Sequence, residues 1–287
     1  MKRLERFAPW FFVLIWSQGF LVAKYAFRNS DVIYFLSIRL FIAAGLLAII
    51  TKIAKQSLRL SRSDFISTVI IGLALHALYL GGVWHAIALG SPSGIASVIT
   101  SLQPVFVSLI AISLLHEPLV KRQYLGLAIG FIGVVLVVAP SLERRNELTA
   151  ASLIFLILAL VGSTSATLMQ KKIGHQIPLL AGTTYQFLIA AFVLSVISIA
   201  TDKTSITWNI ESVAAMFWAV VVTSLIAILL LLWMLSQSSA ARVSSLLYLV
   251  PPATAVQAYL LFDEKLNAQG IVGIGATALG VALVQKR

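Results

Sequence analysis

The sequence predicts an all-α integral membrane protein in which ten transmembrane helices form two inverted five-helix repeats. Three observations lead to this fold class. The chain has 287 residues, of which 60% are hydrophobic and only 11% charged, whereas a soluble domain carries about 25% charged residues. Long apolar runs follow one another with short polar breaks, and the mean hydropathy is +0.99. Segments of the first half of the chain also return in the second half at a constant spacing.

The apolar runs divide the chain into ten candidate spans, because a helix needs roughly 20 apolar residues to cross the hydrocarbon core. Helices are expected, since lipid offers backbone groups no hydrogen-bond partner and the runs are too uniformly apolar for barrel strands. The N-terminal run resembles a signal peptide, but it is long enough to span, and Lys24 stands where a cleavage site needs small residues. The expected spans are 7–28, 32–52, 65–88, 93–115, 120–140, 150–171, 178–200, 212–235, 239–262 and 267–285.

The distribution of basic residues predicts the orientation. Fourteen of the 21 Lys and Arg residues fall on the side of the membrane that holds the N-terminus, six fall on the other side, and Arg39 lies within a span. Because basic residues concentrate in cytoplasmic loops, we expect both termini in the cytoplasm. No basic run reaches the length of about five residues typical of a nucleic-acid patch, so the net charge of +11 predicts no nucleic-acid partner.

A shift of 147 residues aligns the two halves of the sequence. It brings "LLHEPL" at 114–119 onto "LFDEKL" at 261–266, so that Glu117 matches Glu264. The other matched pairs include Lys24 with Lys171, Pro104 with Pro251, Gly126 with Gly273, and Gly133 with Gly280. Five spans per copy is an odd number, so the second copy must enter the membrane from the opposite face. We therefore expect inverted repeats at 1–145 and 146–287, an arrangement typical of transporters that alternate access to a central site.

These features resemble the drug/metabolite transporter superfamily, in its EamA-type ten-helix branch. The resemblance rests on the Pro-to-Glu segments that close the fourth and ninth spans, the Gly-rich fifth and tenth spans, and "WSQGFLVAK" in the first span. Within the family, the chain is most similar to the YddG-like amino-acid exporters. The resemblance implies export of small metabolites across a bacterial inner membrane, and a central cavity lined by spans 1, 3, 4, 6, 8 and 9. The second repeat has Ser163 where the first has Trp16, so we expect a chemically asymmetric cavity.

Polar side chains inside the spans provide the candidate binding residues, because such groups tend to face the interior of a bundle. His76 and Tyr79 are three residues apart and share a helix face, and Gln103 precedes a helix proline. Hydroxyls such as those of Thr223 and Ser224 more often bond their own backbone. The expected substrate-binding residues are Trp16, Gln18, His76, Tyr79, Thr100, Gln103, Ser163, Thr164 and Tyr248.

The positions expected for Arg39 and Trp84 depend on how far each residue lies from the end of its span. Arg39 either extends outward to the membrane surface or lines the interior together with Gln186, which occupies the matching position of the second repeat. Trp84 lies near a span end and is expected in an aromatic belt at the membrane surface. The glycines Gly72, Gly81, Gly126, Gly130 and Gly133 are expected to serve helix packing.

The absence of acidic residues from the spans limits the function. By the expected spans, all ten Asp and Glu residues lie in loops or at span ends, so none is available to carry a proton or hold sodium. A cavity of hydroxyls, amides and aromatic rings without a fixed charge suits neutral or zwitterionic solutes. An anionic phosphate would need convergent Lys or Arg side chains, which are not evident.

Other function classes find little in the sequence. An enzyme is not expected, because Pro92 takes the place of the nucleophile in "GSPSG" and "HEP" at 116–118 lacks a second histidine. With no cysteine, there is no thiolate metal site, and no cofactor or metal is expected. The expected partners are amino acids or related metabolites and the lipid bilayer, with a monomer as the expected assembly. A channel-like pore and a carrier of another metabolite, such as a sugar phosphate or a drug, stay open as alternatives.

The inverted repeat predicts that Glu117 and Glu264 lie on opposite sides of the membrane. Because the chain has no native cysteine, a cysteine placed beside either glutamate can be labelled without background. An impermeant thiol reagent applied to intact cells should label the cysteine near Glu264, and the cysteine near Glu117 only after the cells are opened. Labelling of both positions from one face would contradict the inverted repeat.

Overall fold

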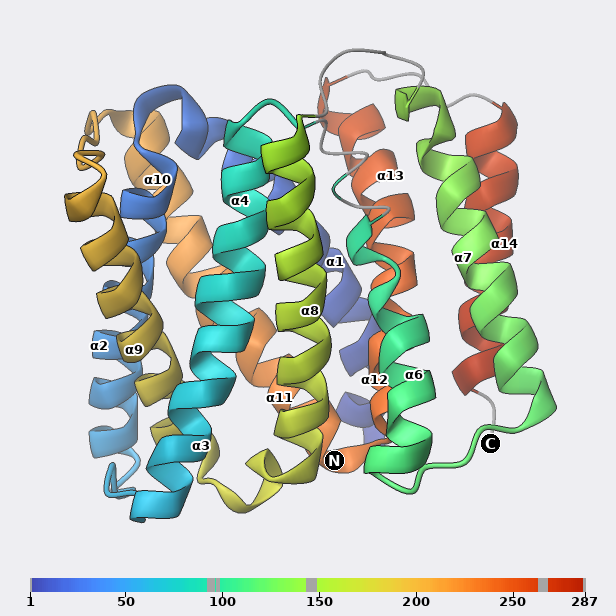
Figure 1. Ribbon diagram of the computed structural model, residues 1–287, viewed down its shortest axis with the longest axis horizontal. Coiled ribbons are helices and arrows are strands. Elements are labelled where there is room, and N and C mark those ends of the chain that lie inside the picture. Colours follow the sequence, from blue (N-terminus) through green and yellow to red (C-terminus); the bar gives the residue numbers. More distant parts are fainter. Residues whose placement is uncertain (1, 92–95, 97–98, 143–148, 263–267, 286–287) are drawn as a thin grey trace.

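The structure is a computed structural model that describes residues 2–91, 96, 99–142, 149–262 and 268–285 (Figure 1). Apart from an isolated bridge between Ser30 and Ile206, the secondary structure of these residues is helical. Within them, six helices are long and apolar enough to cross a membrane. These are α2 (Val32–Ile53), the continuous run α3–η1–α4 (Arg62–Ala88), α8 (Ala150–Lys172), α9 (Leu179–Ala200), the run α10–η3–α11 (Ile210–Gln237) and α14 (Ala268–Gln285).

The remaining helices are shorter or carry more charge. They are α1 (Lys2–Asn29), α6 (Gln103–Leu114), α7 (Lys121–Leu142), the short η2 (Gly174–Gln176), α12 (Ala240–Ser245), η4 (Leu246–Leu249) and α13 (Val250–Phe262). Each expected span overlaps a helix or a continuous helical run, and the ranges 32–52, 150–171, 178–200 and 267–285 agree with helices to within one residue. The start of the expected span 93–115 includes residues outside the described part of the chain.

Several helices begin at residues that satisfy their free backbone N–H groups. The Ser61 hydroxyl accepts a hydrogen bond from Asp64 N at the start of α3. Thr149 and Asn209 form capping boxes with Ser152 and Ser212 at the starts of α8 and α10. Such side chains take over the donors that the first helical turn leaves unpaired. These caps explain why the helices start where they do.

The outer surface of the bundle is apolar, and its interior combines apolar clusters with buried polar side chains. Large side chains such as Trp10, Phe192 and Leu260 are 62–72% exposed. Buried polar residues, among them Gln103 and Gln186, lie between the helices. A soluble protein exposes few contiguous large apolar side chains, so this outer surface suits a bundle surrounded by lipid.

Two helices contain π-helical segments that the sequence did not predict. The segment η1 (Leu73–Leu80) lies between α3 and α4, and η3 (Ala219–Ile226) lies between α10 and α11. The starts of the two segments are 146 residues apart, close to the spacing of the sequence repeat. Because π-helical turns are rare and are frequently found at functional sites, they draw attention to the residues they carry.

Corresponding helices of the two halves run in opposite directions in Figure 1. The run from α3 to α4 ascends, whereas the run from α10 to α11 descends. The pairs α2 with α9, and α7 with α14, lie side by side and are also antiparallel. The beginning of α1 and the end of α14 both lie at the lower end of the bundle.

Glycines allow α7 and α14 to approach each other closely. A Cβ atom on Gly280 would lie 2.4 Å from the backbone nitrogen of Gly130, and one on Gly133 would lie 2.5 Å from that of Thr277. A Cβ on Gly126 would lie 2.7 Å from the Gly280 carbonyl oxygen. The expectation that Gly126, Gly130 and Gly133 serve helix packing is confirmed.

This close approach predicts a difference between two glycines of the same helix. Replacement Gly280→Ala places a methyl group against backbone atoms that cannot move away, and overpacking of this kind costs about 1–3 kcal/mol. Gly275→Ala is the matched control, because a Cβ there meets no atom within 4 Å. In detergent, Gly280→Ala should lower the melting temperature by several degrees, whereas Gly275→Ala should leave it unchanged or raise it slightly. Equal melting temperatures for the two variants would contradict the close approach.

Candidate functional site

Three adjoining cavities occupy the centre of the bundle, and all of them are lined by Trp16 and Tyr79. The arginine cavity also has Arg39, His76, Trp84, Thr223 and Ser224 in its wall. The second cavity is lined by Thr100, Ser101, Gln103 and Pro251, and the third by Gln103, Ser163, Thr167 and Ser244. Trp16 and Tyr79 therefore stand where the three cavities meet.

The cavities are small. The space that water centres can occupy is about 60 Å³ in the arginine cavity and about 20 and 10 Å³ in the other two. One water needs about 10–15 Å³ on this measure. The arginine cavity can thus hold several waters or one small polar group, whereas a whole metabolite requires the helices to move apart.

Arg39 connects α2 to the π-helical segment η3. Its Nε donates to Ser224 Oγ, and its Nη2 donates to Thr223 Oγ1, each at 2.8 Å. The guanidinium carbon lies 5.6 Å from the centre of the Trp84 ring, which suits a cation–π contact. The Arg39 side chain is only 4% exposed, so a positive charge is held inside the bundle.

The opposite wall of the arginine cavity contains His76 in η1. Its ring contacts Phe187 of α9 edge to face, at 4.7 Å between centroids, and the Gln186 side chain lies beside it. His76 is 1% exposed, and its Nε2 has no hydrogen-bond partner among the described residues. Most buried polar atoms have a hydrogen-bond partner, so an unpartnered atom beside a cavity makes His76 a candidate to contact a water or a ligand there.

The third cavity is organised by Gln103. Its Nε2 donates to Thr167 Oγ1 at 2.9 Å and lies 3.4 Å from the Ser163 carbonyl oxygen. Gln103 begins α6, with Pro104 in the first turn, where a helix tolerates proline because the missing N–H would be unpaired anyway. This contact joins α6 to α8 across the centre of the bundle.

The structure brings six of the nine expected binding residues to the cavities: Trp16, His76, Tyr79, Thr100, Gln103 and Ser163. Gln18, Thr164 and Tyr248 do not line them. Gln18 accepts a hydrogen bond from Trp218 Nε1, Thr164 is buried with its hydroxyl unpaired, and the Tyr248 ring packs against Gly130. The role of all nine residues in binding stays a prediction.

Several expectations about neighbouring residues were wrong. Trp84 is not in a surface belt but is 3% exposed beneath Arg39. For Arg39, the interior position is found and the outward alternative is not. The central cavities are therefore not free of fixed charge. Thr223 and Ser224 accept hydrogen bonds from Arg39, beyond the structural role expected of them. The sequence repeat contained a signal that Thr223 faces the cavity. A shift of 147 residues matches Thr223 with His76, which was expected to line it.

The carboxylates lie outside the three cavities, as far as the structure describes them. Asp31 and Asp64 stand at the starts of α2 and α3, and Glu211 stands in the first turn of α10. Glu117 and Asp202 follow the ends of α6 and α9. The expectation that Glu143, Glu147, Asp263 and Glu264 lie in loops falls outside the described residues, as does the side chain of Glu5.

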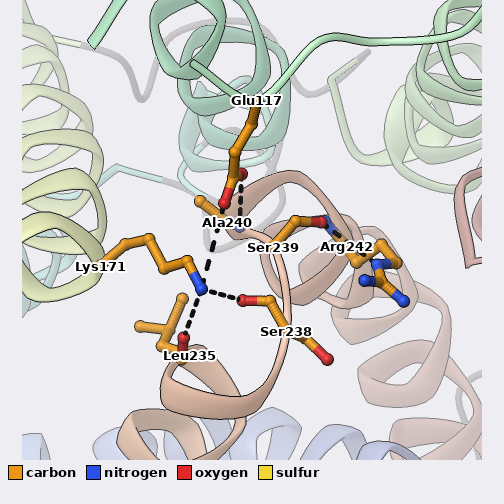
Figure 2. Close-up of polar contacts among 7 residues, drawn as sticks. All are labelled: Glu117, Lys171, Leu235, Ser238, Ser239, Ala240 and Arg242. Carbon is orange, nitrogen blue, oxygen red and sulfur yellow. Dashed lines mark hydrogen bonds and ion pairs between the residues drawn. The ribbon is translucent and has the colours of Figure 1, made fainter. Parts of the chain in front are cut away.

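A polar cluster joins the lower ends of α6, α8, α11 and α12, and Figure 2 shows its contacts. We call Glu117, Lys171, Leu235, Ser238 and Ala240 the end cluster. Lys171 Nζ donates to the carbonyl oxygens of Ser238 and Leu235 at 2.7 and 3.2 Å, and it lies 4.0 Å from Glu117 Oε1. Glu117 Oε2 accepts a hydrogen bond from Ala240 N at 3.0 Å.

The end cluster lies directly below the third cavity. Lys171 follows Thr167 by one helical turn, and Ala240 precedes Ser244 by one turn. Thr167 and Ser244 both line that cavity. The cluster therefore connects helices that also form the cavity wall, and it lies between that wall and the lower end of the bundle.

Comparison with known proteins shows that the chain is similar to membrane transporters over nearly its whole length. The model of the EamA-like transporter family matches it twice, at residues 10–139 and 150–285. An uncharacterized transporter of Archaeoglobus fulgidus is 23% identical over 277 residues, which are 96% of each chain. YedA, an uncharacterized inner membrane transporter of Escherichia coli K12, is 25% identical over 94% of this chain and 87% of its own length. A solved crystal structure with 13% identity has the same fold, with a TM-score of 0.79 over 96% of this chain and 95% of that one.

The end cluster predicts that loss of Lys171 exposes the third cavity. Replacement Lys171→Gln removes the charge that holds Glu117 and the two carbonyl groups, and Lys172→Gln makes the same change at an exposed neighbour. A cysteine at Ser244, which is 2% exposed, reports access to the cavity. An impermeant thiol reagent should label Ser244→Cys several times faster with Lys171→Gln than with Lys172→Gln. Equal rates for the two would show that the cluster does not restrict access.

Proposed function

The chain is a membrane transporter that belongs to the EamA-like transporter family, and we propose that it exports small neutral or zwitterionic metabolites, with amino acids as the expected class. The observation that carries the proposal is the set of three cavities at the centre of the bundle. Both halves of the chain contribute to their walls, and hydroxyl, amide and aromatic groups gather there. The resemblance to YddG-like exporters supports amino acids within that range.

We propose further that the helices form ten crossings arranged as two inverted repeats, at 1–145 and 146–287. Two separate matches to one family model support the division. The opposite directions of α2 and α9, and of α7 and α14, are what an inverted repeat requires. The similar positions of η1 and η3 in the two halves add a third argument.

An inverted repeat supports alternating access, because the two halves can exchange conformations and open one end while closing the other. We propose that the end cluster closes the lower end, because its contacts link α6, α8, α11 and α12 there. The sequence repeat supplies the same residue types again, since Lys171 matches Lys24 and Glu117 matches Glu264. Glu264 and the side chain of Lys24 lie outside the described part of the chain. On the distribution of basic residues, the lower end is the cytoplasmic one.

The cavity geometry favours a carrier over a channel-like pore. A pore needs a continuous passage, whereas the described residues enclose separate small spaces with Trp16 and Tyr79 between them. A solute can pass these side chains only if the surrounding helices move. Each transport cycle then moves a limited number of molecules, and transport saturates as the solute concentration rises.

Counterflow in liposomes tests this proposal. Purified protein should take up a labelled amino acid faster into liposomes loaded with the same unlabelled compound, since a carrier returns loaded more readily than empty. Tyr79→Ala should slow this exchange by about tenfold, because loss of a buried contact of this size weakens binding by 1 kcal/mol or more. Tyr124→Ala is the control, since Tyr124 lies on the outer surface. Uptake that never saturates and does not respond to internal solute would indicate a pore.

The same assay examines energy coupling. An ion that crosses with the solute needs a binding group within the membrane, commonly Asp, Glu or His. No carboxylate of the described residues lines the cavities, and His76 is the histidine that does. A proton ionophore should therefore change the exchange rate by less than about threefold. Strict dependence on a proton gradient, lost on replacement of His76, would make that residue the coupling group.

A further inference from the structure

Arg39 carries a charge for which the described residues provide no counter-ion. Its two hydrogen bonds go to neutral hydroxyl groups, and the carboxylates that the structure describes lie at the ends of helices. The nearest acidic residue on its own helix is Asp31, two turns away at the start of α2. A buried charge without a partner is strongly unfavourable, and in a membrane protein such a residue marks a functional site.

The guanidinium retains donors for a ligand. It has five N–H groups, and the described protein contacts use two of them, on Nε and Nη2. These two contacts and the Trp84 ring fix the orientation of the group. Arg39 also lines the arginine cavity, which holds a space of about 60 Å³ for water centres. The positioned cation and the free space beside it form a site for a small anionic group.

The charge of the site selects a carboxylate rather than a phosphate. Arg39 is the cationic side chain in the wall of the cavity, and the other polar groups there are neutral hydroxyl, imidazole or indole groups. One guanidinium balances one negative charge, as a carboxylate carries, whereas a phosphate group at neutral pH carries up to two and requires convergent basic residues. The planar fork of arginine also matches the two oxygens of a carboxylate.

We propose that Arg39 binds the carboxylate of the transported solute, and that the protein selects solutes that carry this group. The inference rests on the proposed transport function and specifies its substrate class. The carboxylate occupies the arginine cavity, while the remainder of the solute extends past Trp16 and Tyr79 when the helices separate. The matching position in the second repeat is the neutral Gln186, so the charge lies in one wall of the site and gives the bound solute a single orientation.

Matched pairs of ligands test the proposal directly. Binding of glycine, leucine and phenylalanine to the detergent-purified protein is measured by calorimetry beside their carboxamides, at about pH 6.5, where the amino groups stay protonated. The amides keep nearly the same size and shape, but they replace the negative carboxylate with a neutral group that has one acceptor oxygen and an NH₂ donor. For at least one pair, the acid should bind about tenfold or more tightly than its amide, as expected for a charge-assisted hydrogen bond. Equal affinities throughout, or no binding of any acid, would overturn the proposal.

Variants then assign the selectivity to Arg39. In Arg39→Gln the acid and the amide should bind within about twofold of each other, whereas Arg39→Lys should retain part of the preference. Arg59→Gln makes the same change at an exposed residue and should keep the full preference. Selectivity that survives in a folded Arg39→Gln variant would also overturn the proposal. If that variant does not yield a monodisperse protein, the wild-type ratio of acid to amide affinity decides.

The binding assay separates this inference from the transport function. Selective, Arg39-dependent binding of an acid without counterflow in liposomes would leave the carboxylate site standing and remove the transport proposal for that solute. Counterflow that proceeds equally well with acids and amides would support a carrier and reject the carboxylate site. Phosphoethanolamine, which has a phosphate but no carboxylate, serves as a further probe, and binding as tight as that of the amino acids would show that the site accepts a phosphate instead.

Discussion

Hydrocarbon offers no hydrogen-bond partner to a polar group, and the architecture follows from that constraint. Backbone groups satisfy one another within helices, and most buried hydroxyls do the same locally. The hydroxyls of Thr51, Thr183 and Thr277 each donate to the carbonyl oxygen four residues earlier in their own helix. Other polar side chains bond to a neighbouring helix, as Ser37 of α2 does to the Ala191 carbonyl oxygen of α9. Among these contacts, those of Arg39 and Gln103 line the central cavities.

The two halves share a backbone plan but differ in chemistry. Arg39 of α2, in the first half, donates a hydrogen bond to Thr223 of η3, the π-helical segment of the second half. In the matching contact, Gln186 of α9 lies beside His76. The contact between α7 and α14 depends on the close approach of their backbones, and glycines of α7 recur at the matching positions of α14. Recognition of a solute depends on side chains, and there the repeats are free to diverge.

The sequence was sufficient for the positions of the helices and insufficient for the directions of some side chains. The ends of α2, α8 and α9 were predicted closely, because an uninterrupted apolar run with polar residues or proline at its ends is a local property of the sequence. The position of Arg39 could not be derived in this way, since its partners Thr223 and Ser224 lie more than 180 residues away. Trp84 was assigned to a surface belt from its distance to a span end, but Arg39 attracts it inward.

The sequence predicted residues of the candidate site where a polar or aromatic side chain lies near the middle of a span. His76, Tyr79 and Gln103 are polar or aromatic residues near the middle of their spans, and all three line the cavities. Gln18 and Tyr248 satisfied the same criteria, yet one bonds to Trp218 and the other packs against a glycine. The difference depends on helix rotation, which a sequence that is apolar on all faces does not encode. The π-helical segments change that rotation midway along two helices.

These π-helical segments lie within two long helices that are otherwise α-helical, so each helix contains two hydrogen-bond patterns. A π segment pairs each N–H with the carbonyl group five residues earlier, so conversion to α-helix exchanges one internal pattern for another and leaves no backbone group unpaired in lipid. If the hydrogen-bond register of the segment shifts by one residue, the part of the helix that follows rotates about its axis by roughly 100°, the angle between successive residues of an α-helix. His76 and Tyr79 lie in one such segment, and Thr223 and Ser224 lie in the other. Such a rotation changes which side chains of a helix face the centre while the helix itself stays unbroken.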